Sequence, residues 1–138
     1  MRRNSALLAG TVCLVIASGA YGKPIVLKCD VAAGASQGGI VNALYFLQFE
    51  PGLAEGQVID GLIKHETGGM IAMKVIGDAA NRTDFSWRFR AKTSSGAIFP
   101  VIFKATYFKA DKSFVVSGTI SGGNYVGSAE GRGSCKAQ

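Results

Sequence analysis

The sequence predicts an antiparallel all-β domain folded as an up-and-down barrel of about eight strands. Apolar and polar residues alternate with a period of two along most of the chain, and turn signals separate the alternating runs. Helical periodicity is nearly absent. The last run carries only small residues on one face and ends in a cysteine, as expected for a strand that closes a barrel against the first strand. A two-sheet β-sandwich is the alternative architecture.

Residues 1–22 have the layout of a secretory signal peptide. A basic start, Met1-Arg2-Arg3, precedes an apolar run and then small residues that allow cleavage after Ala20 or Gly22. The apolar run is short for a membrane-spanning helix, which is the alternative. We therefore expect residues 23–138 to form a single β-barrel domain that is periplasmic or secreted.

The expected mature chain is mildly basic. Loss of Arg2 and Arg3 lowers the formal net charge from +6 to +4. Proteins that bind nucleic acids usually carry denser basic patches, so we expect no nucleic-acid partner.

Two cysteines remain after the expected cleavage, Cys29 on the first strand and Cys135 on the last. An even pair of cysteines in an exported protein predicts a disulfide. Joining residues this far apart stabilises a fold by about 4 to 5 kcal/mol on the chain-entropy model. Two unrelated buried thiols are the alternative.

The first half of the expected domain contains four apolar runs. Residues Ile25–Val31 alternate cleanly and form the first strand. Residues 40–49 are apolar on both sides, so both a strand and a helix remain open there. Residues 58–66 and 70–76 flank Thr67-Gly68-Gly69, a turn signal that predicts a hairpin.

The second half alternates more regularly and predicts four further strands, in residues 85–92, 97–107, 114–120 and 125–135. Three pairs define the expected register of their hairpins: Ala91 with Ala97, Tyr107 with Phe114, and Ile120 with Tyr125. The first register sets Asp84 against Lys104 on the outer face. Pro100 cannot donate a ladder hydrogen bond, so we expect a bulge or an opening there.

The small face of the last run has a structural interpretation. Its members are Gly127, Ala129, Gly131, Gly133 and Cys135. Residues this small let aromatic rings from neighbouring strands lie over bare backbone, and glycine lets a strand bend where a sheet closes.

The sequence offers no catalytic or metal-binding constellation. His65 is the only histidine, and it lacks the second histidine of a zinc-protease helix and the GxSxG of a serine hydrolase. We expect His65 to be an exposed hairpin residue. The acids that could act in pairs show no distinctive spacing; they are Asp60, Glu66, Asp78 and Asp84. We therefore expect no cofactor and no enzymatic activity, with a carboxylate- or histidine-dependent hydrolase as the alternative.

A row of basic residues is the most suggestive surface feature. Arg88, Arg90 and Lys92 project from one face of a strand at intervals of about 7 Å. Lys104 on the next strand is expected to lie beside them. Such a row can bind a phosphate, a sulfated sugar or an acidic protein. A solvated wall whose charges discourage aggregation is the alternative.

A second surface feature is a set of apolar residues expected to point outward. Its members are Ile40, Leu44, Phe46, Ile98 and Ile102. Exposed apolar side chains in this number predict a covering helix, a partner or a second copy of the chain.

These features together predict a non-catalytic, exported barrel that binds a small ligand or a partner protein, as an inhibitor or accessory factor does. An anionic ligand or an acidic protein partner matches the basic row. A cavity inside the barrel is required for a ligand carrier and not for a partner-binding scaffold. A small outer-membrane barrel is a further alternative. The interior of such a barrel is polar, whereas the bare face of the last strand here meets apolar partners.

Overall fold

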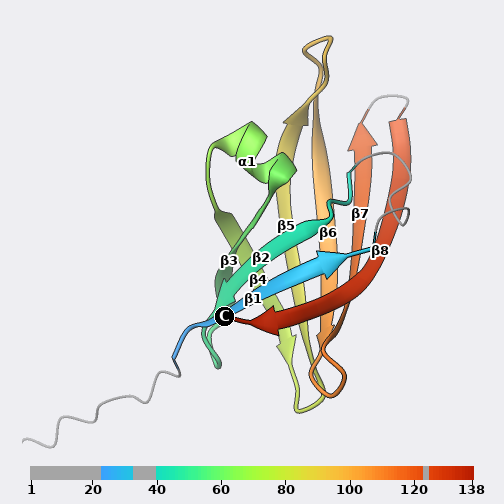
Figure 1. Cartoon of the computed structure of the whole chain (residues 1–138). Coiled ribbons are helices and arrows are strands. Elements are labelled where there is room, and N and C mark those ends of the chain that lie inside the picture. The colour runs from blue at the N-terminus through green and yellow to red at the C-terminus, as the bar shows by residue number, and fades with distance from the viewer. Residues whose placement is uncertain (1–22, 33–39, 123–124) are drawn as a thin grey trace, which may run out of the picture.

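The computed structural model describes residues 23–32, 40–122 and 125–138, which form eight strands and one short helix (Figure 1). The elements are β1 (Ile25–Val31), β2 (Leu44–Phe49), β3 (Glu55–Asp60), α1 (Gly61–Thr67), β4 (Ile71–Asp78), β5 (Arg82–Lys92), β6 (Ile98–Phe108), β7 (Ser113–Gly122) and β8 (Tyr125–Ala137). Each strand pairs with the next, and β8 pairs with β1, always antiparallel. The predicted closed up-and-down barrel is confirmed. The expected signal peptide, residues 1–22, lies outside the described residues.

The barrel closes where the two ends of the domain meet. Cys29 on β1 lies directly opposite Cys135 on β8, and the two form the predicted disulfide. A side chain at Gly133 would overlap the backbone of Asp30, because β8 crosses β1 too closely there. A Cβ at Gly131 would lie 2.6 Å from Cγ1 of Val31. The small residues of β8 therefore allow close contact with β1.

Aromatic rings fill the interior of the barrel. Tyr45, Phe103 and Phe114 are completely buried. The Trp87 ring stacks on Phe103 with centroids 5.4 Å apart, and the Tyr45 ring lies 5.9 Å from that of Phe114. A Cβ at Gly118 would come within 2.8 Å of the Phe103 ring, so this ring lies over bare backbone on β7 and not, as predicted, on β8, where Gly131 meets valine side chains. The interior is a packed core.

In β5 to β8, the alternation of apolar and polar residues placed the side chains on the correct face of each strand. Two of the three predicted hairpin registers are wrong. Tyr107 pairs with Phe114 as predicted. Ala91 pairs with Phe99 instead of Ala97, because the amide of Thr93 donates to the carbonyl of Ala97 and Gly96 adopts φ 88° in a shorter loop. Ile120 pairs with Gly127 instead of Tyr125, because the ladder continues to Gly122. Both errors are shifts of two residues, which keep every side chain on its face.

A helix replaces the second part of the strand predicted at residues 58–66. The Asp60 side chain accepts a hydrogen bond of 2.7 Å from the amide of Ile63 and caps the N-terminus of α1. Gly68, at φ 82°, ends the helix, and its amide donates to the carbonyl of Lys64. Ile63 is completely buried and anchors the helix on the barrel. The predicted turn at Thr67-Gly68-Gly69 is thus a helix C-cap.

Residues 40–49 contain a strand, which decides between the two alternatives left open. The strand β2 starts at Leu44, and Ile40 and Val41 are buried ahead of it. The expected irregularity at Pro100 is not found in the β5–β6 ladder, where Pro100 pairs with Arg90. The register shift lies instead in the β4–β5 ladder, between Val75 and Gly77.

The opening expected at Pro100 lies on the other side of β6, where pairing with β7 stops although both strands run on. The β6–β7 ladder begins at Val101, immediately after the proline. Successive residues of a strand direct their backbone groups to opposite sides, and Pro100 directs its nitrogen toward β7. The missing N–H therefore falls at the end of a ladder, a position at which sheets accept proline.

Candidate functional site

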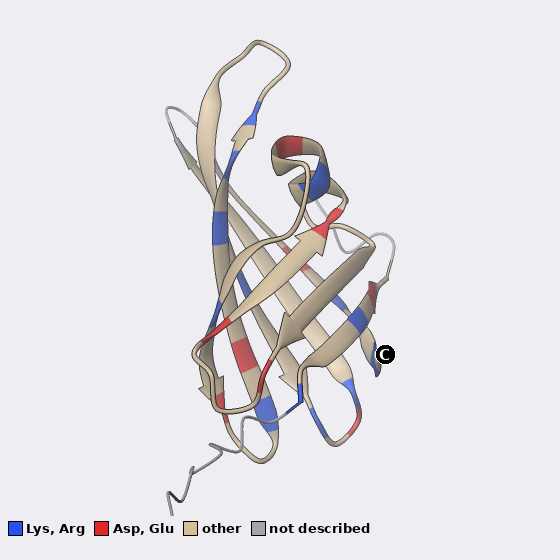
Figure 2. Cartoon of the chain, turned by 90° about the vertical axis from the view of Figure 1, so that its left-hand side faces the viewer, with Lys and Arg blue, Asp and Glu red and all other residues tan. Residues whose placement is uncertain are grey.

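The four predicted site residues lie on one part of the outer surface, which we call the basic wall: Arg88, Arg90 and Lys92 on β5 and Lys104 on β6. All four are exposed, and the residues between those on β5 are buried. Lys104 pairs with Ser86, so it is diagonal to Arg88 and not opposite Asp84 as predicted. Figure 2 shows Lys and Arg recurring along the strands that rise to the tallest hairpin.

The charges of the basic wall are uncompensated. Within the described part of the chain, none of its four cations has a carboxylate oxygen within 4.0 Å. Two other cations do have such partners: Nζ of Lys109 lies 2.7 Å from Oδ1 of Asp78, and Nε of Arg82 lies 3.3 Å from Oδ2 of Asp84. Several lysines elsewhere on the barrel, such as Lys28 and Lys136, also lack an ion pair among the described residues. The basic wall differs from them in that four such cations are aligned on two neighbouring strands.

A row of apolar residues on β6 runs beside the cations on β5. The cross-strand pairs are Arg88 with Ile102, Arg90 with Pro100, and Lys92 with Ile98. The side chains of Ile98 and Ile102 are 62% and 40% exposed. A partner that covers the basic wall therefore meets charge and apolar surface together.

The other predicted outward apolar residues do not join this row. Leu44 and Phe46 are half-buried on β2 and line a different groove, of about 470 Å³. Ile40 is buried, which corrects its predicted outward position. Its side chain lies close to the bare backbone of Gly118 and helps to fill the interior. The predicted set is therefore divided between the core and two separate surfaces.

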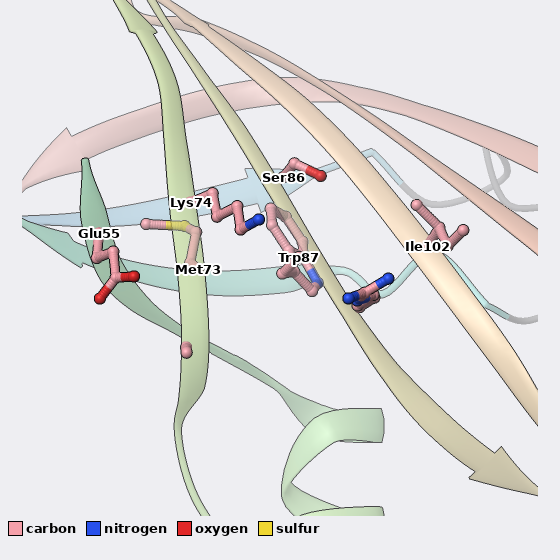
Figure 3. A pocket seen from close by; sticks show the side chains of 8 residues that line it. Glu55, Met73, Lys74, Ser86, Trp87 and Ile102 are labelled. Atoms are coloured by element: carbon pink, nitrogen blue, oxygen red, sulfur yellow. The ribbon is translucent and has the colours of Figure 1, made fainter.

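The barrel wall splits beside the basic wall, in a region that we call the fork, bounded by residues 71–74 of β4 and 86–92 of β5. Pairing between β4 and β5 ends at Lys74 and Ser86, whereas β5 remains paired with β6 up to Lys92. The start of β4 pairs with β3. A groove of about 420 Å³ lies at this point. Figure 3 shows Met73, Lys74 and Trp87 where the two strands diverge.

Sequence analysis missed the fork, because it depends on where β4 ends relative to β5. Lys74 was not identified as a site residue, although it lines the groove together with Arg88. Trp87 is 3% exposed, and its Nε1 is buried without a hydrogen-bond partner among the described residues. The alternation of residues 85–92 did predict an inward position for Trp87, but not its location at a break in the wall.

The residues considered for catalysis lie in separate places. His65 is on α1 with its side chain 82% exposed, and its Nδ1 lies 3.3 Å from Oε1 of Glu66. Asp78 accepts hydrogen bonds from Lys109 and Thr83, which lower its pKa. In the described ranges, no three potential metal-ligating side chains come together. Asp84 lies on the face of the basic wall, diagonal to Lys104, but it is engaged by Arg82 and Thr106.

A small polar cluster lies inside the barrel near the start of α1. Burial raises the pKa of the Asp60 carboxyl, and Oδ2 of this residue has no hydrogen-bond partner among the described residues. Burial also raises the pKa of Tyr45, whose hydroxyl accepts a hydrogen bond from the amide of Asn42. Asp60 caps the helix, so the cluster has a structural role.

Comparisons with known proteins add no family. No family model, curated protein or solved structure matches the chain. No helix in the described residues is long and apolar enough to cross a membrane. The basic wall, its apolar row and the fork together make up the candidate site.

Proposed function

We propose that this protein is exported and binds an acidic partner protein through the basic wall, as a non-catalytic inhibitor or accessory factor. The observation that carries the proposal is the alignment of Arg88, Arg90, Lys92 and Lys104 on one face of two paired strands, without an ion-pair partner within the described residues. Aligned cations without internal partners attract acidic surfaces and fix their register.

The packed interior favours a partner protein over a carried ligand. Eight-stranded barrels that carry ligands hold them in an internal cavity. Here Tyr45, Phe103 and Phe114 occupy that space and are completely buried. The grooves of about 420 and 470 Å³ are lined mainly by side chains of the outer wall, together with the buried Met73, Trp87 and Asp60. Binding at the outer surface, to an extended partner, is the function that this arrangement supports best.

The disulfide supports export. Disulfides persist in oxidising compartments, such as the periplasm and the cell exterior, and are rare in the cytosol. The Cys29–Cys135 bond joins the first and last strands. It agrees with the signal-peptide pattern of residues 1–22, and both features favour a periplasmic or secreted location.

The alternative functions have less support. A hydrolase needs paired catalytic groups, and His65 and the acids are dispersed or engaged in structural hydrogen bonds. An outer-membrane barrel presents an apolar belt to lipid. The outer positions of β5 carry charges at Arg88, Arg90 and Lys92 instead.

The proposal is tested with a charge-reversed variant and a matched control. The variant carries Arg88→Glu and Arg90→Glu, and the control carries Lys28→Glu and Lys136→Glu. Lys28 and Lys136 are a cross-strand pair on the outer face of β1 and β8, away from the basic wall, and the change in net charge is the same. The probe is a capped polyglutamate peptide, whose affinity is measured by calorimetry at two salt concentrations.

We expect the variant to bind the peptide at least about tenfold more weakly than the wild type, which corresponds to about 1.4 kcal/mol. The control should stay within about threefold of the wild type. Equal losses in both proteins would show that net charge alone matters. An unchanged affinity of the variant rules out the basic wall as the site.

A further inference from the structure

Along residues 88–92 of β5, the backbone groups that face β4 have no strand partner among the described residues. The amide of Thr93 donates to the carbonyl of Ala97, and the amide of Lys109 donates to the carbonyl of Asn81. These two bonds flank the regular β5–β6 ladder, so the odd-numbered residues between them direct their backbone groups toward β6. The even-numbered residues, including Arg88 and Arg90, direct theirs toward β4. Pairing with β4 has already ended at Ser86.

The backbone groups of Arg88 and Arg90 therefore lack a strand partner on that side. Among the described residues, no loop, helix or side chain donates to or accepts from them, although α1 packs against β5. A row of free N–H and C=O groups is a template on which an extended segment adds as a further strand. The tall β5–β6 hairpin extends this edge past α1 (Figure 1).

The side chains on this edge specify what kind of strand adds. Arg88, Arg90 and Lys92 recur every second residue on the outer face, which is the side-chain period of any strand. A segment with acids at alternate positions places each carboxylate directly opposite a cation, where unlike charges stabilise the pair. A second copy of the same edge would place like charges opposite one another. The edge thus selects an acidic strand and disfavours self-pairing.

The space at the fork suits the other face of such a strand. Residues between the acids would point inward, toward the groove of about 420 Å³ that includes Met73 and Trp87. Met73 and Trp87 are apolar and 1% and 3% exposed. Small or branched apolar side chains match these neighbours.

We infer that the free edge of β5, residues 88–92, takes up an extended segment of a partner protein as an added antiparallel strand. Acidic residues of the segment alternate with small apolar ones. This inference rests on the proposed function, because it uses the cations of the basic wall, and it adds the backbone as the second part of the recognition.

The test uses three capped octapeptides of alternating glutamate and valine: the parent, one N-methylated at the glutamates and one N-methylated at the valines. In an antiparallel addition the residues opposite Arg88 and Arg90 direct their N–H groups toward β5, and these residues are the glutamates. Methylation of the glutamate nitrogens therefore removes the ladder bonds without changing charge. Methylation of the valine nitrogens is the matched control, because those groups point away from β5. Affinity is read from the fluorescence of Trp87, the only tryptophan of the chain.

We expect glutamate methylation to weaken binding at least about tenfold, because each ladder bond contributes about 0.5 to 1.5 kcal/mol. Valine methylation should change the affinity by less than about threefold. The parent peptide should also slow hydrogen exchange at the amides of Arg88 and Arg90 and leave the amide of Phe89 unchanged.

Each contrary outcome has a distinct meaning. If all three peptides bind equally and Arg88→Glu with Arg90→Glu abolishes binding, strand addition is excluded and the proposed function stands. If the charge-reversed protein binds the parent peptide as the wild type does, both proposals fail. Failure of the parent peptide to bind at millimolar concentration overturns the strand addition.

Discussion

Two places in the barrel wall differ in how neighbouring strands are held together: the contact between β1 and β8, which we call the seam, and the fork between β4 and β5. They differ in strand pairing and in covalent linkage. At the seam, β1 and β8 are paired from Leu27 to Val31, and the Cys29–Cys135 disulfide links them. At the fork, the ladder ends at Ser86 and the neighbouring residues of β5 are exposed cations. The barrel is cross-linked where the first and last strands of the domain meet, and among the described residues its backbone lacks a strand partner beside the cations of the basic wall.

Because of this difference, we assign the stability of the barrel mainly to the seam and partner binding to the fork. A strand at the end of a chain frays unless it is tied down, and the seam joins the first strand of the domain to the last. The residues of the fork belong to long hairpins whose other side is fully paired, so β5 keeps its shape without β4. Changes at the seam should therefore affect unfolding, and changes at the outer edge of the fork should affect partner binding.

Removal of the disulfide has the largest expected effect. The variant with Cys29→Ala and Cys135→Ala should lose about 4 to 5 kcal/mol of unfolding free energy, because the cross-link restricts a very long loop of the unfolded chain. Urea unfolding measures this loss. A loss below about 1 kcal/mol contradicts the assignment of the seam as the main fastening of the barrel.

A side chain at Gly133 should be the next most damaging change. Gly133→Ala places a Cβ against the backbone of Asp30, which cannot move aside as a flexible side chain would. We expect a loss of about 2 to 3 kcal/mol by thermal or urea unfolding. Gly127→Ala on the same strand is the control, because none of the described residues lies within 4 Å of its added Cβ, and it should stay within about 0.5 kcal/mol. Equal effects of the two substitutions contradict the close crossing of β8 and β1.

The buried carboxyl of Asp60, at the start of α1, gives a smaller effect with a defined pH dependence. Burial raises the pKa of Asp60 in the folded state, so the folded protein binds its proton more tightly than the unfolded chain does. The unfolding free energy should therefore fall as the pH rises from the unfolded pKa to the raised folded pKa. Asp60→Asn keeps a capping oxygen and removes the charge.

The Asp60→Asn variant should be more stable than the wild type at neutral pH, by on the order of 1 kcal/mol, and the advantage should vanish in acid. Thermal unfolding between pH 3 and pH 7 measures both. A constant difference across this range means that the carboxyl does not titrate between the folded and unfolded states.

The closed end of the β4–β5 ladder should give the smallest effect. The pKa of Asp78 is lowered, mainly by the hydrogen bond from Lys109. The stabilisation by this pair is complete above the unfolded pKa of Asp78 and is lost as the pH falls through the lowered folded pKa. Lys109→Met should cost about 0.5 kcal/mol more at pH 7 than at pH 2. A smaller cost can remain at pH 2, because Nζ of Lys109 also donates to the carbonyl of Ala79. Equal costs at the two pH values contradict a contribution from the ion pair.

The features that follow from the alternation of apolar and polar residues could be predicted from the sequence. Facing positions such as those of Phe103 and Arg88 follow from a period of two, and a shift of register by two residues leaves them correct. The disulfide was predictable because only Cys29 and Cys135 remain after the expected cleavage. The row of cations on β5 was visible for the same reason as the core, since alternate residues share a face.

The features that depend on where elements end could not be predicted in this way. The helix α1 was missed because Thr67-Gly68-Gly69 was interpreted as the turn of a hairpin, although Asp60 and Gly68 are a good N-cap and C-cap. The hairpin registers depend on loop geometry, such as the positive φ of Gly96. The fork arises because β4 pairs with β3 but no longer with β5 near Met73. This pairing depends on the tertiary fold, and no local sequence pattern indicates it.

Hydrogen exchange at single amides of β5 in the free protein tests the central claim most directly. The free edge predicts alternation: the amides of Arg88 and Arg90 exchange at nearly the rate of an unstructured chain, and those of Phe89 and Ala91, bonded to β6, exchange at least about a hundredfold more slowly. Uniform protection of all four amides would contradict it, because it would mean that β5 already has a partner on both sides.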